Sequence, residues 1–419
     1  MKIALYNLTT TTKLGGVESI VWDVGQKLAE RGHDVTLFGG KGKIYRNSSS
    51  VQVRRYPYIA RETWGRMPLL RKSLNLLKLL ERLSMAASAL PDLMAGKFDI
   101  VQVVKPYDFP VGAHVRYYGG ARMVYNSHGT DFFPGDILFR RSIDGAFACS
   151  RYNATMVEAR YHIPIGVSYN GYDAELFRPL PPDPALRARY APDGAPLLLY
   201  AGRLVTFKGL DHLLDAVALL NGVPQQRVFA ERTDRETGRP GDTRHEMLDE
   251  KLSTAGLWSL VSGLPVSLSP RLILAGEGPH RANLEARAAR LGIADRVRFL
   301  GPVPHTDLPA LHAISDMFVM PSTDHETFCL AACEAMSCAR PVVASRIGGL
   351  VEVVRDGETG LLAPPADPTG LAAHIGALLG DPALRVRMGV AGREWTLAMF
   401  TWEHVIARML ACYEQVLGA

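Results

Sequence analysis

Residues 320–345 read MPSTDHETFCLAACEAMSCARPVVAS and carry most of the information about the fold and its site. An apolar run at 317–320 predicts a strand that leads into a polar loop at 322–327. Small and apolar residues at 328–338 predict a helix, and the next strand follows at 341–344. This loop would lie at the carboxyl end of a parallel strand, where open α/β sheets bind ligands. We therefore expect a ligand site here.

Two glutamates stand eight positions apart in this stretch, Glu326 at the end of the loop and Glu334 inside the expected helix. The amides of Phe328, Cys329 and Leu330 would open the helix and face a phosphate, because the first amides of a helix lack partners within it. Glu334 could then bind a ribose diol, and Glu326 could bind hydroxyls of a sugar beyond the phosphates. Glutamates near helix starts are also common, so an ordinary helix start remains an alternative.

The segment resembles the signature of retaining glycosyltransferases of family 4, in which such a glutamate pair is followed by a Pro-Val-Val-Ala strand. The resemblance implies the α/β GT-B architecture, with two doubly wound Rossmann-like domains facing across a cleft. It also implies transfer of a sugar from a nucleotide diphosphate sugar. Family members often carry Pro-Phe-Gly where this chain has Thr327, Phe328 and Cys329. We expect this departure to reshape the donor pocket near the sugar without removing the helix amino terminus.

The length of 419 residues suggests two domains of about 150 to 200 residues each. The composition, 47% hydrophobic and 21% charged, is typical of a soluble globular protein. We find neither an apolar run of roughly 20 residues nor a signal peptide, and so expect a cytoplasmic protein. Five cysteines without histidines at ligand spacing favour reduced thiols over disulfides or a metal site.

The formal net charge of +5 is unevenly spread, with eleven Lys or Arg against two Glu between Lys41 and Arg82. Leu70, Leu74 and Leu77 repeat there at helical spacing. A basic amphipathic helix in residues 41–90 could contact an anionic membrane at its inner face or help to receive an acceptor. An ordinary helix packed on its own domain is the simpler alternative. No nucleic-acid module accompanies the basic residues, so we expect no nucleic-acid partner.

Both halves of the chain repeat a short apolar run, a turn and a helical stretch, the pattern of parallel strands covered by helices. We predict strands at 2–6, 35–38, 51–54, 100–104, 123–126, 145–148 and 166–169 in the first half. In the second half we predict strands at 197–201, 272–275, 297–300, 317–320, 342–344 and 360–362.

The predicted domain boundaries follow from composition. Six prolines within residues 178–196 predict a linker at 179–196, which separates an acceptor domain at 1–178 from a donor domain at 197–401. The resemblance implies that a final helix at 402–419 packs back onto the first domain. The stretch 221–270 is longer than a usual turn, and we interpret it as an insertion with a charged middle and a packed return. An acceptor lid or an oligomer contact through Trp258 is the alternative.

Two motifs place phosphate-binding groups after predicted strands. Gly15 and Gly16 follow the first strand and allow close backbone approach, so helix amides there could meet the diphosphate or the acceptor. Arg203 and Lys208 lie between a strand and a helix of the second domain. Paired cations of this kind can neutralise a departing nucleoside diphosphate in place of a metal. Solvated loop charges are the simpler alternative.

Three further positions match the family. His128 follows a strand of the first domain and could bond a sugar hydroxyl or orient the acceptor, with Asp131 nearby; the resemblance implies contact with the donor sugar. Gly276 permits a tight turn after a strand, beside the nucleotide base. The resemblance places base contacts around Val303. A structural histidine and ordinary turn chemistry are the alternatives.

The resemblance also implies retention of the anomeric configuration, with the leaving phosphate acting as base. On that mechanism Arg203, Lys208, Glu326 and His128 are catalytic, and no metal or cofactor is needed. The acceptor could be a small molecule such as an inositol-type polyol or an antibiotic aglycone, or a lipid-linked glycan. A nucleotide-sugar-binding module without transferase activity is the main alternative. A nicotinamide-dependent oxidoreductase would need the glycine fingerprint G-x-G-x-x-G, which we do not find in either half.

Overall fold

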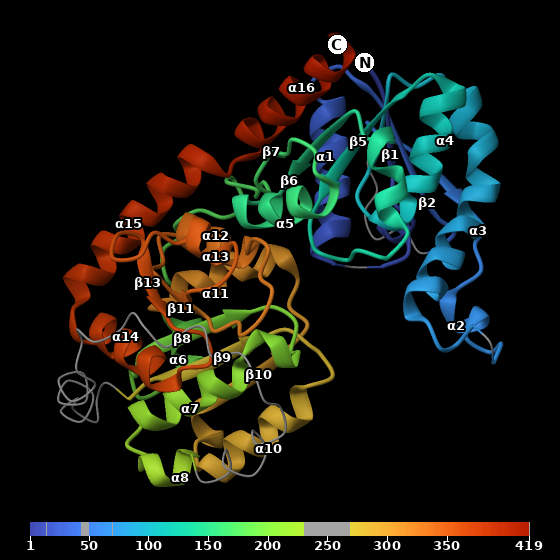
Figure 1. Cartoon of the computed structure of the whole chain (residues 1–419). Helices are drawn as coiled ribbons and strands as arrows, with labels where there is room; N and C mark the ends of the chain where they lie inside the picture. The colour runs from blue at the N-terminus through green and yellow to red at the C-terminus, as the bar shows by residue number, and fades with distance from the viewer. Residues whose placement is uncertain (14, 43–49, 69, 230–268, 419) are drawn as a thin grey trace. The chain divides into compact units, whose positions relative to one another are not determined.

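The computed structural model describes residues 1–13, 15–42, 50–68, 70–229 and 269–418. The chain divides into two compact units (Figure 1). Unit 1 comprises Met1–Gly171 and Phe400–Ala419, and unit 2 comprises Tyr172–Met399.

Unit 1 is built on a seven-stranded sheet in the order β3-β2-β1-β4-β5-β6-β7. Every neighbouring pair in this sheet is parallel. The strands are β1 Lys2–Tyr6, β2 Asp34–Gly40, β3 Gln52–Tyr56, β4 Ile100–Val103, β5 Arg122–Ser127, β6 Gly145–Ala148 and β7 Gly166–Val167. The direction of the winding reverses between β1 and β4, which makes the carboxyl ends of these two strands the switch point of the unit.

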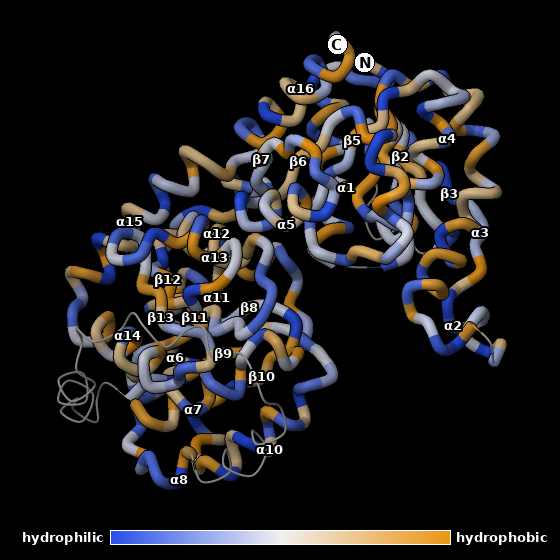
Figure 2. Tube along the Cα trace, in the orientation of Figure 1, coloured by the Kyte–Doolittle hydropathy of each residue, from blue (hydrophilic) through white to orange (hydrophobic). Residues whose placement is uncertain are grey.

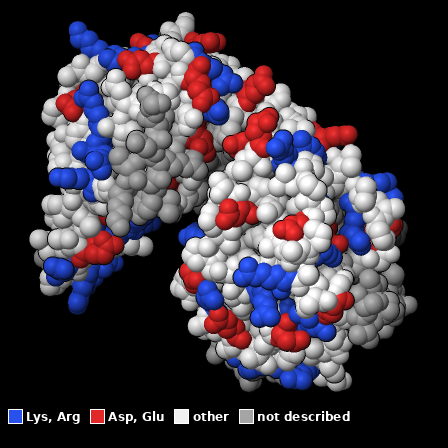
Figure 3. All heavy atoms as spheres, turned by 180° about the vertical axis from the view of Figure 1, so that it is seen from behind, with Lys and Arg blue, Asp and Glu red and all other residues white. Residues whose placement is uncertain are grey.

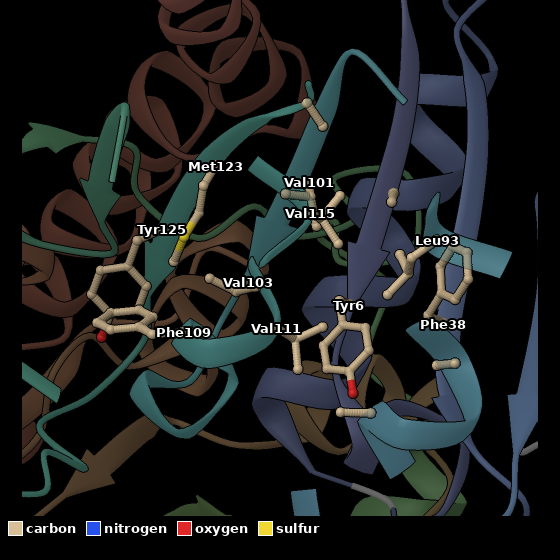
Figure 4. Packing of buried hydrophobic residues seen from close by; sticks show 14 of the residues in the cluster. Tyr6, Phe38, Leu93, Val101, Val103, Phe109, Val111, Val115, Met123 and Tyr125 are labelled. Carbon is tan, nitrogen blue, oxygen red and sulfur yellow. The ribbon is translucent and has the colours of Figure 1, made fainter. Parts of the chain in front are cut away.

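Helices cover the sheet of unit 1 and bury its apolar side chains. They are α1 Gly16–Ala29, α2 Arg61–Trp64, α3 Leu74–Ala95, α4 Phe109–Gly119, α5 Arg151–Tyr161 and α16 Trp402–Gly418. Figure 4 shows part of this core, in which the rings of Phe109 from α4 and Tyr125 from β5 meet edge to face at 4.9 Å. Aromatic pairs in this arrangement stabilise a core beyond the area that they bury.

The C-terminal helix α16 is an integral part of unit 1. Its Tyr413 hydroxyl donates a hydrogen bond to the side-chain oxygen of Gln102 on β4. Near its start, Ser168 Oγ donates to the carbonyl of Val405 at 3.2 Å, and the Trp402 ring lies so close to Gly171 that a Cβ there would clash. Contacts near both ends of α16 therefore attach it to the rest of unit 1, although the chain reaches it only after completing unit 2.

Unit 2 contains a second parallel sheet, of six strands, in the order β10-β9-β8-β11-β12-β13. Its strands are β8 Leu197–Ala201, β9 Arg271–Ala275, β10 Val297–Gly301, β11 Met317–Met320, β12 Val342–Ser345 and β13 Gly360–Ala363. Hydrophobic residues follow the strands of both sheets (Figure 2), as expected for strands covered on both faces. The winding reverses between β8 and β11.

The helices of unit 2 are α6 Pro184–Tyr190, α7 Leu210–Leu220, α8 Gln225–Phe229, α10 Arg281–Leu291, α11 Leu308–Ile314, α12 Leu330–Ser337, α13 Leu350–Val353, α14 Pro368–Gly380 and α15 Pro382–Met399. They pack on a sheet whose four central strands, β9, β8, β11 and β12, are almost fully buried.

All thirteen predicted strands are present, and the prediction of two doubly wound α/β units is confirmed. The predicted linker at 179–196 differs from the structure because it contains helix α6. Asp183 caps this helix by accepting hydrogen bonds from the next two amides, and Pro184 stands in its first turn, where a proline needs no amide partner. The units divide after Gly171 rather than at 178. Residues 230–268 of the predicted insertion, including Trp258, lie outside the described residues.

The surface carries charges of both signs. On the face that Figure 3 shows, basic and acidic side chains are interspersed over both units. Among the described residues, no helix combines the length and the apolar character needed to cross a bilayer.

Candidate functional site

The predicted cations and glutamate of unit 2 meet at its switch point. Strands β8 and β11 are direct neighbours, so the loops that leave their carboxyl ends lie side by side. The first loop carries Lys208 and the second carries Glu326, and the ammonium of Lys208 donates a hydrogen bond to Oε2 of Glu326. Ser322 Oγ donates to the same oxygen at 3.0 Å. The side chains of Lys208 and Glu326 are only 13% and 14% exposed. Water therefore screens the electrostatic interaction between the two charges less than it would at the surface.

Backbone contacts hold these two loops together. Gly209 adopts φ +65°, and a Cβ at this position would lie 2.0 Å from the carbonyl oxygen of Pro321. The amide of Thr323 in the β11 loop donates to the carbonyl of Phe207 in the β8 loop at 2.9 Å. The amide of Gly349, which follows β12, donates to the carbonyl of Glu326 at 2.7 Å and joins the β11 loop to the loop after β12. The glycine is thus required for the close approach of the loops, and the approach positions Lys208 against Glu326.

His325 marks a strained turn just before Glu326. Its φ of 25° lies in a region that residues other than glycine rarely adopt, and such conformations persist only where the surrounding structure enforces them. This turn directs the chain so that Glu326 points back toward the β8 loop.

Arg203 is the more exposed of the two predicted cations. Its guanidinium lies 5.9 Å from the ring centre of Phe207, and the ammonium of Lys208 lies 5.6 Å from the same ring. The hydroxyl of Tyr200 donates to the carbonyl of Arg203 at 2.9 Å and thereby holds the start of the loop. Two cations from one loop therefore flank a shared aromatic side chain beside Glu326.

Helix α12 begins later than the sequence predicts. The sequence predicts that the amides of Phe328, Cys329 and Leu330 open the helix. In the structure Leu330 is the first helical residue, and Cys329 is the N-cap of the helix. Phe328 and Cys329 look suited to a helix because they are apolar, but here they are buried just before its first residue. The first turn of amides therefore comprises residues 330–332, which still follow the loop of Glu326 directly.

The cysteines near this helix are buried thiols. All five cysteines of the chain are free. Burial raises the pKa of Cys329 to about 12, and the nearby carboxylate of Glu326 acts in the same direction. At neutral pH Cys329 therefore packs as an uncharged side chain and does not compete with the glutamates for a cation.

Glu334 lies on α12 with its side chain 9% exposed, and it has a partner that the sequence analysis missed. Nε2 of His305 lies 2.8 Å from Oε1 of Glu334, and the His305 ring packs 4.8 Å from that of Phe177. His305 follows strand β10 closely, so the strand-end position that singled out His128 could also have singled out His305. Val303, predicted to lie near the nucleotide base, is half-buried two residues earlier.

Gly276 stands after β9, where its predicted role in a tight turn has a clear structural basis. It adopts φ +146°, and a Cβ would lie 1.9 Å from the carbonyl oxygen of Gly202. The β8 and β9 loops are joined further by the amide of Leu204, which donates to the carbonyl of Glu277 at 3.0 Å. Gly276 therefore permits the contact that supports the loop of Arg203.

The remaining predicted site residues, Gly15, Gly16 and His128, belong to unit 1. Gly15 is the N-cap of α1 and Gly16 its first residue, at the carboxyl-end side of β1. His128 directly follows β5 and is half-buried. Desolvation lowers its pKa to about 3, with a smaller contribution from the charge of Lys105, so the ring is neutral at physiological pH. A neutral imidazole can both donate and accept a hydrogen bond, as a sugar hydroxyl requires.

Comparison with known proteins bears directly on this arrangement. Residues 14–176 match the family model "Glycosyltransferase Family 4", and residues 265–395 match "Glycosyl transferases group 1". The chain is 30% identical over 321 residues to the GDP-mannose-dependent alpha-(1-6)-phosphatidylinositol monomannoside mannosyltransferase of Mycolicibacterium smegmatis, covering 71% of this chain and 72% of that protein. The chain belongs to glycosyltransferase family 4. Two further curated relatives match over half of their length or less: the 2-deoxystreptamine glucosyltransferase of Streptomyces kanamyceticus (39% identical, 38% of that protein) and D-inositol 3-phosphate glycosyltransferase 1 of Catenulispora acidiphila (34% identical, 50% of that protein).

Solved structures support the GT-B fold of this family 4 enzyme. Sucrose-phosphate synthase from Thermosynechococcus elongatus matches with a TM-score of 0.75 and 22% identity, over 100% of this chain and 99% of that one. Anabaena HepE, solved in complex with UDP, matches with a TM-score of 0.71 and 20% identity, over 99% and 100% of the two chains. At these identities the likeness concerns the fold.

Proposed function

We propose that this glycosyltransferase transfers a sugar from a nucleotide diphosphate sugar to a hydroxyl acceptor, with retention of configuration and without a metal. The observation that supports this most strongly is the placement of Lys208, Arg203 and Glu326 at the switch point of unit 2, next to the first turn of α12. This is the edge of a doubly wound sheet at which ligands bind.

The chemistry requires stabilisation of a leaving diphosphate. As the glycosidic bond breaks, negative charge develops on the phosphate oxygen that leaves. The ammonium of Lys208, the guanidinium of Arg203 and the amides at the start of α12 offer preorganised positive charge and dipoles for it. These groups supply the charge neutralisation that a divalent metal would otherwise provide, and this supports metal independence.

The other predicted roles follow the family resemblance. Glu326 and His128 would bind hydroxyls of the transferred sugar, Glu334 would bind the ribose, and the loops of Gly276 and Val303 would flank the base. The leaving phosphate would accept the proton of the acceptor hydroxyl on the face from which it departs. Gly15 and Gly16 would bring the start of α1 close to a phosphate or an acceptor.

Relatives suggest two nucleotide donors and one type of acceptor. One relative is named for its dependence on GDP-mannose and for an inositol lipid acceptor, and HepE is solved with UDP. We therefore propose a UDP- or GDP-sugar as donor and a polyol, glycan or lipid-linked hydroxyl compound as acceptor.

The donor proposal predicts thermal stabilisation by the correct nucleotide. A nucleoside diphosphate at 100 times its dissociation constant should stabilise the native state by about 2.7 kcal/mol. UDP, GDP, ADP and their sugars would be screened by thermal shift, with and without EDTA, and diphosphate release measured in parallel. We expect one base to be preferred and the shift and the release to persist in EDTA. A shift without release, across a broad acceptor panel, would instead support a binding module.

We also propose that unit 1 makes peripheral contact with anionic membranes through the predicted stretch 41–90. Helix α3 starts at Leu74 and not before Leu70, and it packs on its own unit through Leu77, Met85, Ala89 and Leu93. Several large apolar side chains nevertheless remain exposed on α3 and in the segment before it: Leu74, Leu76 and Leu83 on the helix, and Ile59 and Met67 before it. Exposed Arg66, Arg71 and Lys72 lie in the same stretch, and such cations contribute about 1 kcal/mol each near an anionic surface.

Vesicle binding tests this contact. We expect the protein to cosediment with phosphatidylglycerol-containing vesicles at low salt, and the triple change Met67→Ser, Leu74→Ser and Leu76→Ser to reduce the bound fraction at least about tenfold, since each buried CH₂ is worth about 0.8 kcal/mol. Val386→Ser, which changes an even more exposed apolar side chain on α15 of unit 2, is the control. Absence of wild-type binding at low salt would reject the contact.

A further inference from the structure

We propose that His280 is a positioning residue for Lys208, the cation that is proposed to act on the leaving diphosphate. The inference rests on the proposed transferase function and deepens it, because it names what holds that cation in place. His280 lies between strand β9 and helix α10 and is the N-cap of α10. The loop that it contacts runs from the end of β8 to the start of α7 and carries both Arg203 and Lys208.

His280 contacts this loop near both of its ends. At the first end, the amide of His280 donates a hydrogen bond to the carbonyl of Leu204 at 3.0 Å. At the second end, Nε2 of the His280 ring lies 2.6 Å from Oδ2 of Asp211, the second residue of α7. Asp211 stands three positions after Lys208 in the chain. The backbone contact therefore supports the end near Arg203, and the ring contact supports the end near Lys208.

The orientation of the His280 ring is fixed by a second partner. Its other nitrogen, Nδ1, lies 3.3 Å from the side-chain amide nitrogen of Asn283, in the first turn of α10. An amide nitrogen can only donate, so Nδ1 accepts, and a neutral ring carries its proton on Nε2, which faces Asp211. The side chain of His280 is only 11% exposed, so water has little access to the ring. A hydrogen bond to a carboxylate is stronger than one between neutral groups, and it holds the start of α7.

The contact of His280 with Asp211 is not what joins the two helices. Helices α7 and α10 pack side by side (Figure 1), and a second ion pair connects them farther from the loop. Arg287 on α10 donates to Oδ1 of the fully buried Asp215 on α7 at 2.7 Å. The distinct effect of His280 is therefore local to the start of α7, next to Lys208. Such local support matters for catalysis, because a displacement of about 1 Å at a group that acts on the reacting atoms can cost about 100-fold in rate.

Removing the ring tests this role by its effect on turnover. His280→Ala should lower kcat about 10-fold or more and weaken donor binding much less, because the ammonium of Lys208 would no longer be held where charge develops. His280→Gln should recover most of the lost turnover, since its amide nitrogen can still donate to Asp211. Steady-state kinetics, donor titration and melting curves would be measured on the same preparations.

Two further variants separate positioning from stability. Asp211→Asn keeps the shape of the side chain but replaces the charged acceptor by a neutral one, so it should lower kcat in the same direction and by less than His280→Ala. It also tests the contact if His280→Ala does not fold. Arg287→Lys is the matched control, because it weakens the other ion pair between α7 and α10. It should lower the melting temperature and leave kcat unchanged.

A double-mutant cycle tests whether His280 acts through Lys208. If it does, adding His280→Ala to Lys208→Ala should lower turnover by less than about twofold, since the positioned ammonium is already absent. Two effects that multiply in the double variant would overturn the inference, as would an unchanged kcat in folded His280→Ala and Asp211→Asn. Wild-type turnover in Lys208→Ala would instead reject the leaving-group role. Failure of the wild type to release diphosphate from any nucleotide sugar would overturn the transferase function itself.

Discussion

Replacing Lys208 by alanine should lower turnover about 100-fold or more while weakening donor binding much less, as expected for loss of a preorganised group that stabilises developing charge. Lys208 lies at the switch point beside the first turn of α12, and its ammonium is largely shielded from solvent. Its attraction for the leaving diphosphate should grow as the bond breaks, so the loss should appear mainly in kcat. Steady-state kinetics and donor titration of the same preparation would separate the two effects.

The Lys208→Ala variant also leaves Glu326 without its cation, so a second variant is needed. If Lys208 serves only to neutralise Glu326, adding Lys208→Ala to Glu326→Gln should cost nothing beyond the loss that Glu326→Gln itself causes. If it acts on the leaving group, adding Lys208→Ala should lower turnover further. Arg298→Ala, which removes an exposed cation from β10 of the same unit, is a matched control and should stay within about twofold of wild type. Turnover near wild type in Lys208→Ala would reject the leaving-group role.

The strands and their parallel arrangement were predictable because buried strands appear as short apolar runs at regular intervals. The contact between Lys208 and Glu326 could not be predicted in this way, because the two residues are 118 positions apart in the sequence. It depends on β8 and β11 being neighbours, and strand order is determined by packing of the whole sheet. The sequence therefore identifies both groups as candidates, and the topology brings them together.

Helix α6 and the start of helix α12 differ from the sequence prediction, and each difference has a physical cause in the residues around it. Helix α6 was missed because the prolines of 179–196 were weighed as helix breakers, whereas Asp183 followed by Pro184 is a helix start signal. Helix α12 starts two residues later than expected because Phe328 and Cys329, although apolar, are buried before the helix and not within it.

Replacing Glu334 by glutamine should weaken nucleotide-sugar binding about 10- to 100-fold, the range for a hydrogen bond to a charged group, with the fold preserved. The carboxylate is a charged acceptor for ribose hydroxyls, whereas the oxygen of a glutamine amide is neutral and accepts weaker hydrogen bonds. His305 bonds one carboxylate oxygen of Glu334 and leaves the other available. Direct titration of wild type and variant with the preferred nucleotide would measure the effect.

Comparing the affinities for a ribonucleotide and its 2′-deoxy analogue tests the role of Glu334 most directly. If Glu334 binds the diol, the wild type should prefer the ribonucleotide over its 2′-deoxy analogue, and Glu334→Gln should reduce that preference toward one. His305→Gln separates the contribution of orientation, because it removes the ring contact with Phe177 and alters the hydrogen bond to Glu334 but keeps the carboxylate. It should weaken both nucleotides similarly and by less than Glu334→Gln. An unchanged preference in Glu334→Gln would show that the ribose binds elsewhere, since loss of the carboxylate must affect any hydroxyl that it holds.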